Sequence, residues 1–193
     1  MKKGFTLIEV SILFVIFLIV ALLVIPLSVD DTKKAKNIMI WKNVQQDFAN
    51  IFNAINSYEQ NQDDSIMPVL SSVLDNSIKD NIETYKITFL NGTFPNPEYR
   101  FVDYKLTQSN AVMAIKFFDE PNENQIGLLM YDVNGKKGPN VWGKDVFGYT
   151  VYKNKFVPFG KDKIISEQKQ DCSKRGTGLY CSNYYLIGGN FDK

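Results

Sequence analysis

Histidine is absent from this sequence of 193 residues, and cysteine occurs only twice. Without histidine the chain forms neither the Ser–His nor the Cys–His pair that activates many enzymatic nucleophiles. The usual zinc ligand sets also need more Cys or His than the sequence contains. No other nucleophile–base pair or catalytic motif is found, so we expect a protein that is not an enzyme.

A charge excess of either sign is also missing. Lys and Arg number 22 against 21 Asp and Glu, which gives a formal net charge of +1. Dedicated nucleic-acid-binding proteins usually carry a marked basic excess, so nucleic acid is not an expected partner. The hydrophobic share of 45% is ordinary, but most of the strongly apolar sequence falls in residues 1–29.

Charge is nearly missing from residues 5–27, where Glu9 is the only charged residue. A helix of this length spans about 34 Å, enough to cross the hydrocarbon core of a membrane. The apolar run is longer than that of a secretory signal peptide, and residues 26–28 make a poor cleavage site. We therefore expect a membrane-spanning helix, with Lys2 and Lys3 holding its N-terminus in the cytoplasm.

The string KGFTLIEV at residues 3–10 resembles the N-terminus of prepilins, the precursors of type IV pilins and type II secretion pseudopilins. In that family a membrane-embedded prepilin peptidase cuts behind a glycine and methylates the new N-terminal residue. The resemblance, which covers roughly residues 1–30, implies cleavage between Gly4 and Phe5 and N-methylation of Phe5. It also implies assembly with other pilin or pseudopilin subunits at an inner-membrane assembly platform.

Two further residues are candidates for a role in assembly. After cleavage, the ammonium group of Phe5 in one subunit could pair with the Glu9 carboxylate of a neighbour in an apolar filament core. Removing one partner of such a buried pair typically costs about 3–5 kcal/mol. A glutamate tolerated at the membrane interface is the alternative. Pro26 is either a flexible joint in a long helix or the end of the membrane helix.

From residue 30 the apolar pattern becomes one-sided. Apolar residues recur at steps of three and four, which predicts a helix that continues to Tyr58 and buries one face. These residues are Ile38, Trp41, Val44, Phe48, Ile51, Phe52, Ile55 and Tyr58. We expect the aromatic ones to be core residues rather than ligand-stacking residues. The expected organisation is a leader at 1–4, a transmembrane or filament-core half-helix at 5–29, an amphipathic half-helix at 30–62 and a globular head at 63–193.

The head contains short apolar runs separated by turn-forming residues. The segment from Val69 to Ile82 is predicted as a short helix or an ordered loop. The predicted strands are Tyr85–Leu90, Tyr99–Leu106, Ala111–Phe118, Ile126–Val133, Val146–Tyr152 and Phe156–Phe159. The expected fold class is α+β, with the long N-terminal helix packed on a C-terminal antiparallel sheet, as in pilins.

The densest motif of the head lies at residues 132–145, and three interpretations stay open. Residues 138–144 nearly match the phosphate-binding pattern G-x-x-x-x-G-K-[ST], but a predicted strand follows where that pattern needs a helix. A calcium site is the second interpretation, because the motif supplies oxygen ligands and some pseudopilins carry calcium in a loop near the end of the sheet. Its ligands would be Asp132, Asn134, Asn140 and Asp145. We favour the third, a hairpin connection in which Asn and Asp side chains cap backbone groups.

Cys172 and Cys181 follow a membrane anchor whose N-terminus is cytoplasmic, which places them in an oxidising compartment. An even pair of cysteines there indicates a disulfide, worth about 3 kcal/mol for a loop of this length. Pilins often close a C-terminal loop in this way. A redox-active pair is the alternative, although the spacing is not C-x-x-C. The basic residues within 166–175 indicate a solvated loop rather than a DNA-binding site.

The prepilin resemblance implies a structural subunit of a type IV pilus or of a type II secretion pseudopilus. Before assembly we expect a single-pass protein of the cytoplasmic membrane with an extracytoplasmic head, and afterwards a component of the filament. No cofactor is expected beyond the calcium alternative. The rival function is a membrane-anchored extracytoplasmic module that binds calcium, a glycan or DNA, and such a protein would keep Met1.

Overall fold

The computed structural model describes residues 7–58, 78–82, 85–122, 125–153 and 155–190. Within these ranges, the side chains of residues 21–30, 51–52, 54–58 and 120–122 are left out of the description. The chain divides into two compact units, Met1–Lys36 and Asn37–Lys193, and each is described by itself.

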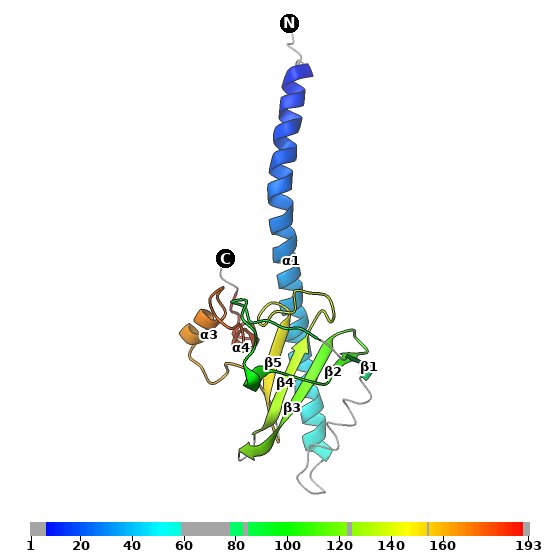
Figure 1. Ribbon diagram of the computed structural model, residues 1–193, viewed down its shortest axis with the longest axis vertical. Helices are drawn as coiled ribbons and strands as arrows, with labels where there is room; N and C mark the ends of the chain where they lie inside the picture. Colours follow the sequence, from blue (N-terminus) through cyan, green and yellow to red (C-terminus); the bar gives the residue numbers. More distant parts are fainter. Residues whose placement is uncertain (1–6, 59–77, 83–84, 123–124, 154, 191–193) are drawn as a thin grey trace. The chain divides into compact units, whose positions relative to one another are not determined.

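The helix α1 runs from Leu7 to Tyr58, a length of 52 residues (Figure 1). It ends at the residue that the apolar pattern predicts. It also continues through Pro26, so the hypothesis that Pro26 ends the helix is wrong. An interior proline removes one backbone N–H donor and bends a helix more readily than it stops one when helix-forming residues flank it.

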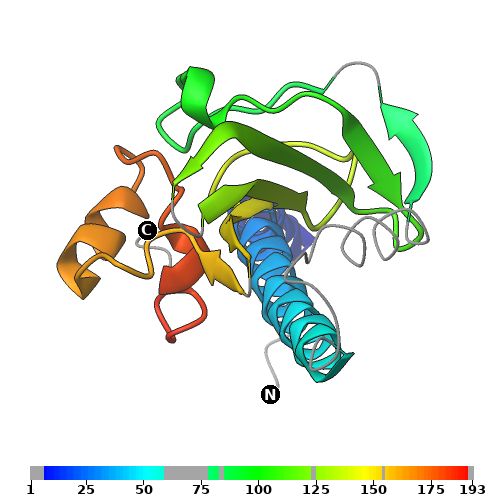
Figure 2. The same cartoon turned by 90° about the horizontal axis from the view of Figure 1, so that it is seen from below.

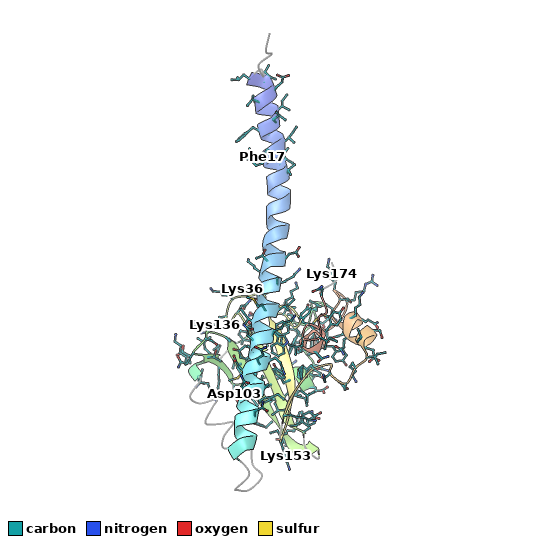
Figure 3. All side chains as sticks on the ribbon, turned by 180° about the vertical axis from the view of Figure 1, so that it is seen from behind. Phe17, Lys36, Asp103, Lys136, Lys153 and Lys174 are labelled. Carbon is teal, nitrogen blue, oxygen red and sulfur yellow. A yellow bond between two sulfur atoms is a disulfide. The ribbon has the colours of Figure 1, made fainter. Side chains whose placement is uncertain are left out.

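In the N-terminal unit, the part of α1 between Leu7 and Val20 displays apolar side chains on every side. All twelve large hydrophobic residues between Leu7 and Val20 are exposed, by 45% to 89% of their surface. Figure 3 shows these side chains, with Phe17 labelled, projecting in different directions around the helix. Within the described residues, no helix combines the length and the apolar character that a membrane crossing requires.

The second unit is built on one six-stranded sheet. The strands are β1 (Ile78–Ile82), β2 (Tyr104–Thr107), β3 (Val112–Asn122), β4 (Gln125–Asp132), β5 (Val146–Tyr152) and β6 (Phe156–Pro158). Each strand pairs antiparallel with the next one in the chain, so the sheet is a simple meander. The prediction of an α+β fold with an antiparallel sheet is confirmed.

Both faces of this sheet are buried, which β4 shows most clearly. Leu129 and Tyr131 belong to one apolar cluster with Trp41 and Phe48 of α1. The alternate residues of β4 belong to a second cluster, together with residues of the segment 85–103. In Figure 2 the C-terminal part of α1 lies on one side of the curved sheet and that segment lies on the other. Because successive residues of a strand point to opposite faces of the sheet, β4 contributes side chains to both apolar clusters.

Trp41 is the main contact between α1 and the sheet. Its ring lies 4.8 Å from that of Phe147 and 4.7 Å from that of Tyr149, measured between centroids. Its indole Nε1 donates a hydrogen bond of 2.8 Å to the Ser182 carbonyl oxygen. Trp41 and Phe48 are thus core residues, as predicted. Phe52 falls among the side chains outside the description.

Several predicted elements of the head are different in the structure. Tyr85–Leu90 is not a strand; it forms one isolated bridge, Thr88 to Val141, and covers the second face of the sheet with Ile87 and Phe89. Its alternation of apolar and polar residues reflects this burial, because the side chains of an extended segment that covers a sheet also point alternately toward the sheet and away from it.

Two other segments also depart from prediction. Residues 78–82 form strand β1, where a helix or loop was expected. Only the end of the predicted strand Tyr99–Leu106 joins the sheet, because the 3-10 helix Pro97–Tyr99 and a left-handed Asp103 (φ 55°) precede it. The left-handed conformation interrupts the extended backbone that a strand needs.

Among the described residues of the second unit, two short α-helices follow the sheet. They are α3 (Ile165–Asp171) and α4 (Cys181–Tyr184). The prediction of a loop over residues 166–175 is therefore wrong for its first part. The short run of helix-forming residues in α3 lies below the length at which sequence periodicity identifies a helix.

Candidate functional site

The predicted processing and assembly residues fall at the beginning of the chain. Gly4 and Phe5 lie outside the described residues. Glu9 lies in the first turn of α1 and is exposed. Pro26 lies inside α1, and its side chain is not among those that the structure describes.

Glu9 is the only charged residue between positions 7 and 20, a stretch whose other large side chains are exposed and apolar. A carboxylate in the first turn of a helix interacts favourably with the unpaired N–H groups of that turn. Removing a charge from water into an apolar environment is costly unless an opposite charge accompanies it. Glu9 is therefore the one charged group on the largely apolar surface of residues 7–20.

The second candidate site is the connection between β4 and β5. Asp132 ends β4 and is fully buried. Its Oδ1 accepts hydrogen bonds from the backbone N–H groups of Asn134 (2.9 Å) and Gly135 (3.0 Å). Its Oδ2 accepts a hydrogen bond from the Tyr85 hydroxyl. These bonds turn the chain immediately after the strand, as Asp side chains commonly do.

Asp145, which precedes β5, shapes the other end of the connection and is also fully buried. Its Oδ1 accepts a hydrogen bond from the Val141 backbone N–H (2.7 Å), and its Oδ2 accepts one from the Asn140 N–H (2.9 Å). The side-chain amide of Asn134 donates to the same Oδ2 at 3.1 Å. The two aspartates thus hold one hairpin connection, which confirms the predicted hairpin and its capping by aspartate side chains. The asparagine side chains do not cap backbone groups in the same way.

The phosphate-binding interpretation is wrong. Residues 138–144 lead into strand β5, which begins at Val146, where the pattern requires the N-terminus of a helix. A phosphate loop depends on the N–H groups of that helix end.

Burial shifts the pKa values of both aspartates upward. Desolvation, followed by the charge of Asp145, raises the pKa of Asp132 to about 7, against the effect of its hydrogen bonds. Burial also raises the pKa of Asp145, while hydrogen bonds from Val141 and Asn140 act in the opposite direction. Burial and the neighbouring Asp132 raise the pKa of Tyr85, so its hydroxyl remains a donor. These partners include no cationic side chain.

The oxygens of this loop fit a calcium ion in kind. The side-chain oxygens of Asn134 and Asn140 are buried, and neither has a hydrogen-bond partner among the described residues. Buried acceptors without partners are rare in native proteins. Among the described residues, no three His, Cys, Asp or Glu side chains gather around one point. A metal here would therefore need the two amide oxygens in addition to the carboxylates.

The predicted disulfide is present. The sulfur atoms of Cys172 and Cys181 are bonded at 2.02 Å, and both residues are buried. Gly143 packs against this bond, since a Cβ at that position would lie 2.6 Å from the Cys181 sulfur. The disulfide therefore closes a loop within the C-terminal segment, and the β4–β5 connection packs against it.

Sequence reasoning missed Tyr85, which closes the Asp132 site from a segment 47 positions away. It also missed Ser182, whose carbonyl accepts the Trp41 bond and whose hydroxyl accepts the Gly148 N–H at 3.0 Å. A single tyrosine or serine has no local pattern that reveals a distant partner.

The described residues define a class of architecture: an α+β protein with a long N-terminal helix and a six-stranded meander. No known family model, curated protein or solved structure matches this chain.

Proposed function

We propose that this protein is a structural subunit of a type IV pilus or a type II secretion pseudopilus. The observation that carries the proposal is the apolar surface of α1 between Leu7 and Val20, which is exposed on all sides and contains one carboxylate. The prepilin-like string at residues 3–10 supports the same function.

Such a surface requires an apolar environment. Monomeric soluble proteins rarely display contiguous apolar patches of this kind, because covering them gains about 25 cal/mol per Å². Lipid covers the surface before assembly, and the helices of neighbouring subunits cover it in the filament. The membrane and further copies or relatives of this chain are therefore the partners, together with the peptidase and the assembly platform.

Glu9 supplies specificity to this association. Cleavage behind Gly4 creates an ammonium group on Phe5, and that group of one subunit pairs with the Glu9 carboxylate of the next. Because an unpaired charge is expensive in an apolar filament core, only the axial register that joins the two charges is stable. Phe5 keeps its positive charge after methylation, so the pairing survives the modification.

A substitution at Gly4, followed by an assembly assay, tests this proposal. In cells that carry the complete assembly machinery, Gly4→Leu blocks cleavage, so the chain stays in the membrane fraction and is absent from sheared filaments. The control is Gly92→Leu, which strains a left-handed surface turn of the head (φ 84°) but lies far from the cleavage site in sequence and leaves cleavage intact. Filaments that contain uncleaved Gly4→Leu chains contradict the proposal.

Calcium binding by the β4–β5 connection is a second candidate function. The observation that favours it is the pair of buried, unpartnered amide oxygens of Asn134 and Asn140 beside two buried carboxylates. Calcium would supply the positive charge that these carboxylates lack among their partners. Asp132, Asn134, Asn140 and Asp145 would hold it.

Melting of the full chain in detergent, with calcium and with a chelator, tests this candidate. Calcium raises the melting temperature of the wild type, and the rise is smaller at pH 5 than at pH 8 because protons compete for the carboxylates. Asn134→Ala weakens the effect without changing the charge, whereas Asp119→Ala, at an exposed position of β3, retains it. An equal melting temperature with and without calcium excludes the site.

A further inference from the structure

The β4–β5 connection lies at the end of the second unit where the chain enters it. Because β3, β4, β5 and β6 form an antiparallel meander, this connection lies at one end of the sheet, and the β3–β4 and β5–β6 turns lie at the other. Asn37 is the first residue of the unit, and its side-chain amide donates a hydrogen bond of 3.2 Å to the Lys144 carbonyl oxygen. We call the end that contains this contact the entry end.

The β4–β5 connection presents cationic side chains to solvent. Lys136 and Lys137 are exposed, and Lys144 is half-buried. Residues 133–144 include no Asp or Glu. The carboxylates of Asp132 and Asp145, which border the connection, are fully buried and accept hydrogen bonds from its backbone. These bonds hold the loop in one conformation, and its lysines rather than its carboxylates face the solvent.

A second loop adds a cation at the entry end. Lys174 is exposed and lies in the disulfide loop, whose residues 172–181 include no Asp or Glu. This loop packs against the β4–β5 connection at Gly178, where an added Cβ would collide with the Trp142 carbonyl oxygen. Figure 3 shows Lys136 and Lys174 toward one end of the second unit and Lys153 at the opposite end.

The opposite end of the sheet carries charges of both signs. The sequence around the β3–β4 turn contains Asp119, Glu120 and Glu123, and the β5–β6 turn contains Lys153 and Lys155. The two turns are neighbours, because β4 pairs with β5. An anionic surface would therefore be attracted to the loops of the entry end and would meet both cations and carboxylates at the other end.

A membrane surface matches the arrangement of these cations. They are exposed on two separate loops, so one broad anionic surface can face both loops at once. Lysines near an anionic bilayer are attracted to its headgroups, and the attraction falls off within a Debye length, about 10 Å at 0.1 M salt. The inference rests on the proposed function, in which the stem lies in the membrane before assembly and the chain leads from it to the entry end.

We propose that the entry end of the head binds the anionic headgroups of the membrane before the subunit enters the filament. Lys136, Lys137 and Lys174 face the lipid phosphates. The buried hydrogen bonds of Asp132 and Asp145 keep the loop in place, so few backbone conformations are lost when it reaches the membrane. The stem provides the anchor, and this contact orients the head.

Acetylation by acetic anhydride, followed by peptide mass spectrometry, tests the proposal on the full chain in nanodiscs. One set of discs contains phosphatidylcholine alone, and the other also contains phosphatidylglycerol. We expect Lys136, Lys137 and Lys174 to react at least about threefold more slowly in the anionic discs. Salt at 1 M removes the difference, because it shortens the Debye length to about 3 Å. Lys153 is the internal control and reacts equally in both discs.

A pair of double variants separates the entry end from charge in general. Lys136→Ser with Lys137→Ser removes the protection of Lys174, because too few cations remain on the face. Lys153→Ser with Lys155→Ser removes the same number of charges from the opposite end and retains the protection of Lys174. A thermal melt verifies that each variant is folded.

Several outcomes contradict the proposal. Equal reaction of Lys136 and Lys174 in both discs removes the membrane contact and leaves the pilin proposal intact, whereas a chain that inserts into neither disc contradicts both. Equal slowing of Lys153 contradicts the assignment to the entry end. Double-stranded DNA, added to phosphatidylcholine discs, is the competing polyanion. If it protects the same lysines as strongly as phosphatidylglycerol does, the partner is a nucleic acid and not the membrane.

Discussion

The apolar side chains at the two ends of α1 differ in solvent exposure. Between Leu7 and Val20 the large apolar residues are exposed all around the helix. Around Trp41, Val44 and Phe48 they form a single stripe, and that stripe is buried against the sheet. The difference shows that the half of α1 with a one-sided apolar pattern is buried by the sheet of the same chain, whereas the half that is apolar on all sides is left uncovered by the described residues.

The largest effect on stability is expected for the buried stripe. Trp41→Ala removes a buried indole with two ring contacts and a hydrogen bond, so it lowers the free energy of unfolding by about 3–5 kcal/mol. Denaturant unfolding followed by circular dichroism measures this loss. Met39→Ala, at a position of the same helix that is 58% exposed, changes it by less than about 0.5 kcal/mol. Similar losses in both variants would show that the stripe has no special role.

The disulfide gives the next largest effect. Replacing Cys172 and Cys181 together by Ala lowers the free energy of unfolding by about 3 kcal/mol, because the unfolded chain regains the entropy of an open loop. The same denaturant measurement applies, with the wild type under reducing conditions as the matched control. An unchanged midpoint in both experiments would mean that the hydrogen bonds from Thr177 and Tyr180 to the Asp171 carboxylate hold this segment by themselves.

A smaller effect concerns pH and the two buried aspartates. The pKa of Asp132 in the folded head is about 7, above its ordinary value of 3.8, so the folded state holds this proton more tightly than the unfolded state. The resulting stability is fully present below the ordinary value and is lost as the pH rises through 7. Without calcium, we expect unfolding at pH 8 to require about 2 kcal/mol less than at pH 5.

Asp132→Asn tests the origin of this pH dependence. The amide keeps an acceptor for the backbone N–H groups and does not titrate, so the difference between pH 5 and pH 8 shrinks. Asp119→Asn, at an exposed position of β3, leaves the difference as it is. If both variants retain the full difference, its source lies elsewhere in the head.

The smallest effect on stability is expected in the N-terminal unit. Glu9→Ala changes the unfolding free energy of the head by less than about 0.5 kcal/mol, because Glu9 is exposed and belongs to a separate unit. Processing behind Gly4 is also normal. Filaments nevertheless fail to form, since the register-setting carboxylate is gone; electron microscopy of sheared preparations measures this. Normal filaments in Glu9→Ala would remove Glu9 from the assembly mechanism.

Much of this architecture follows from the sequence. The end of α1 at Tyr58, the strand Val146–Tyr152 and the Cys172–Cys181 bond agree with prediction. Each depends on a local signal: a helical period, a β-branched and aromatic run, or a pair of cysteines. Such signals need no knowledge of distant residues.

The remaining features depend on contacts between distant segments. The alternation in Tyr85–Leu90 predicts a strand, but the segment covers the second face of the sheet instead. The same pattern fits both arrangements, and only the tertiary structure distinguishes them. The four oxygen-bearing residues of the β4–β5 connection could be named in advance. The burial of these residues and the hydrogen bond from Tyr85 could not be predicted, because Tyr85 lies 47 positions from Asp132 in the sequence.

The mass of the N-terminal peptide, taken from protein in sheared filaments, tests the pilin proposal most directly. We predict a chain that begins at Phe5 and carries one added methyl group on its amino nitrogen. A chain that still begins at Met1, found only as single molecules in the membrane, would contradict it.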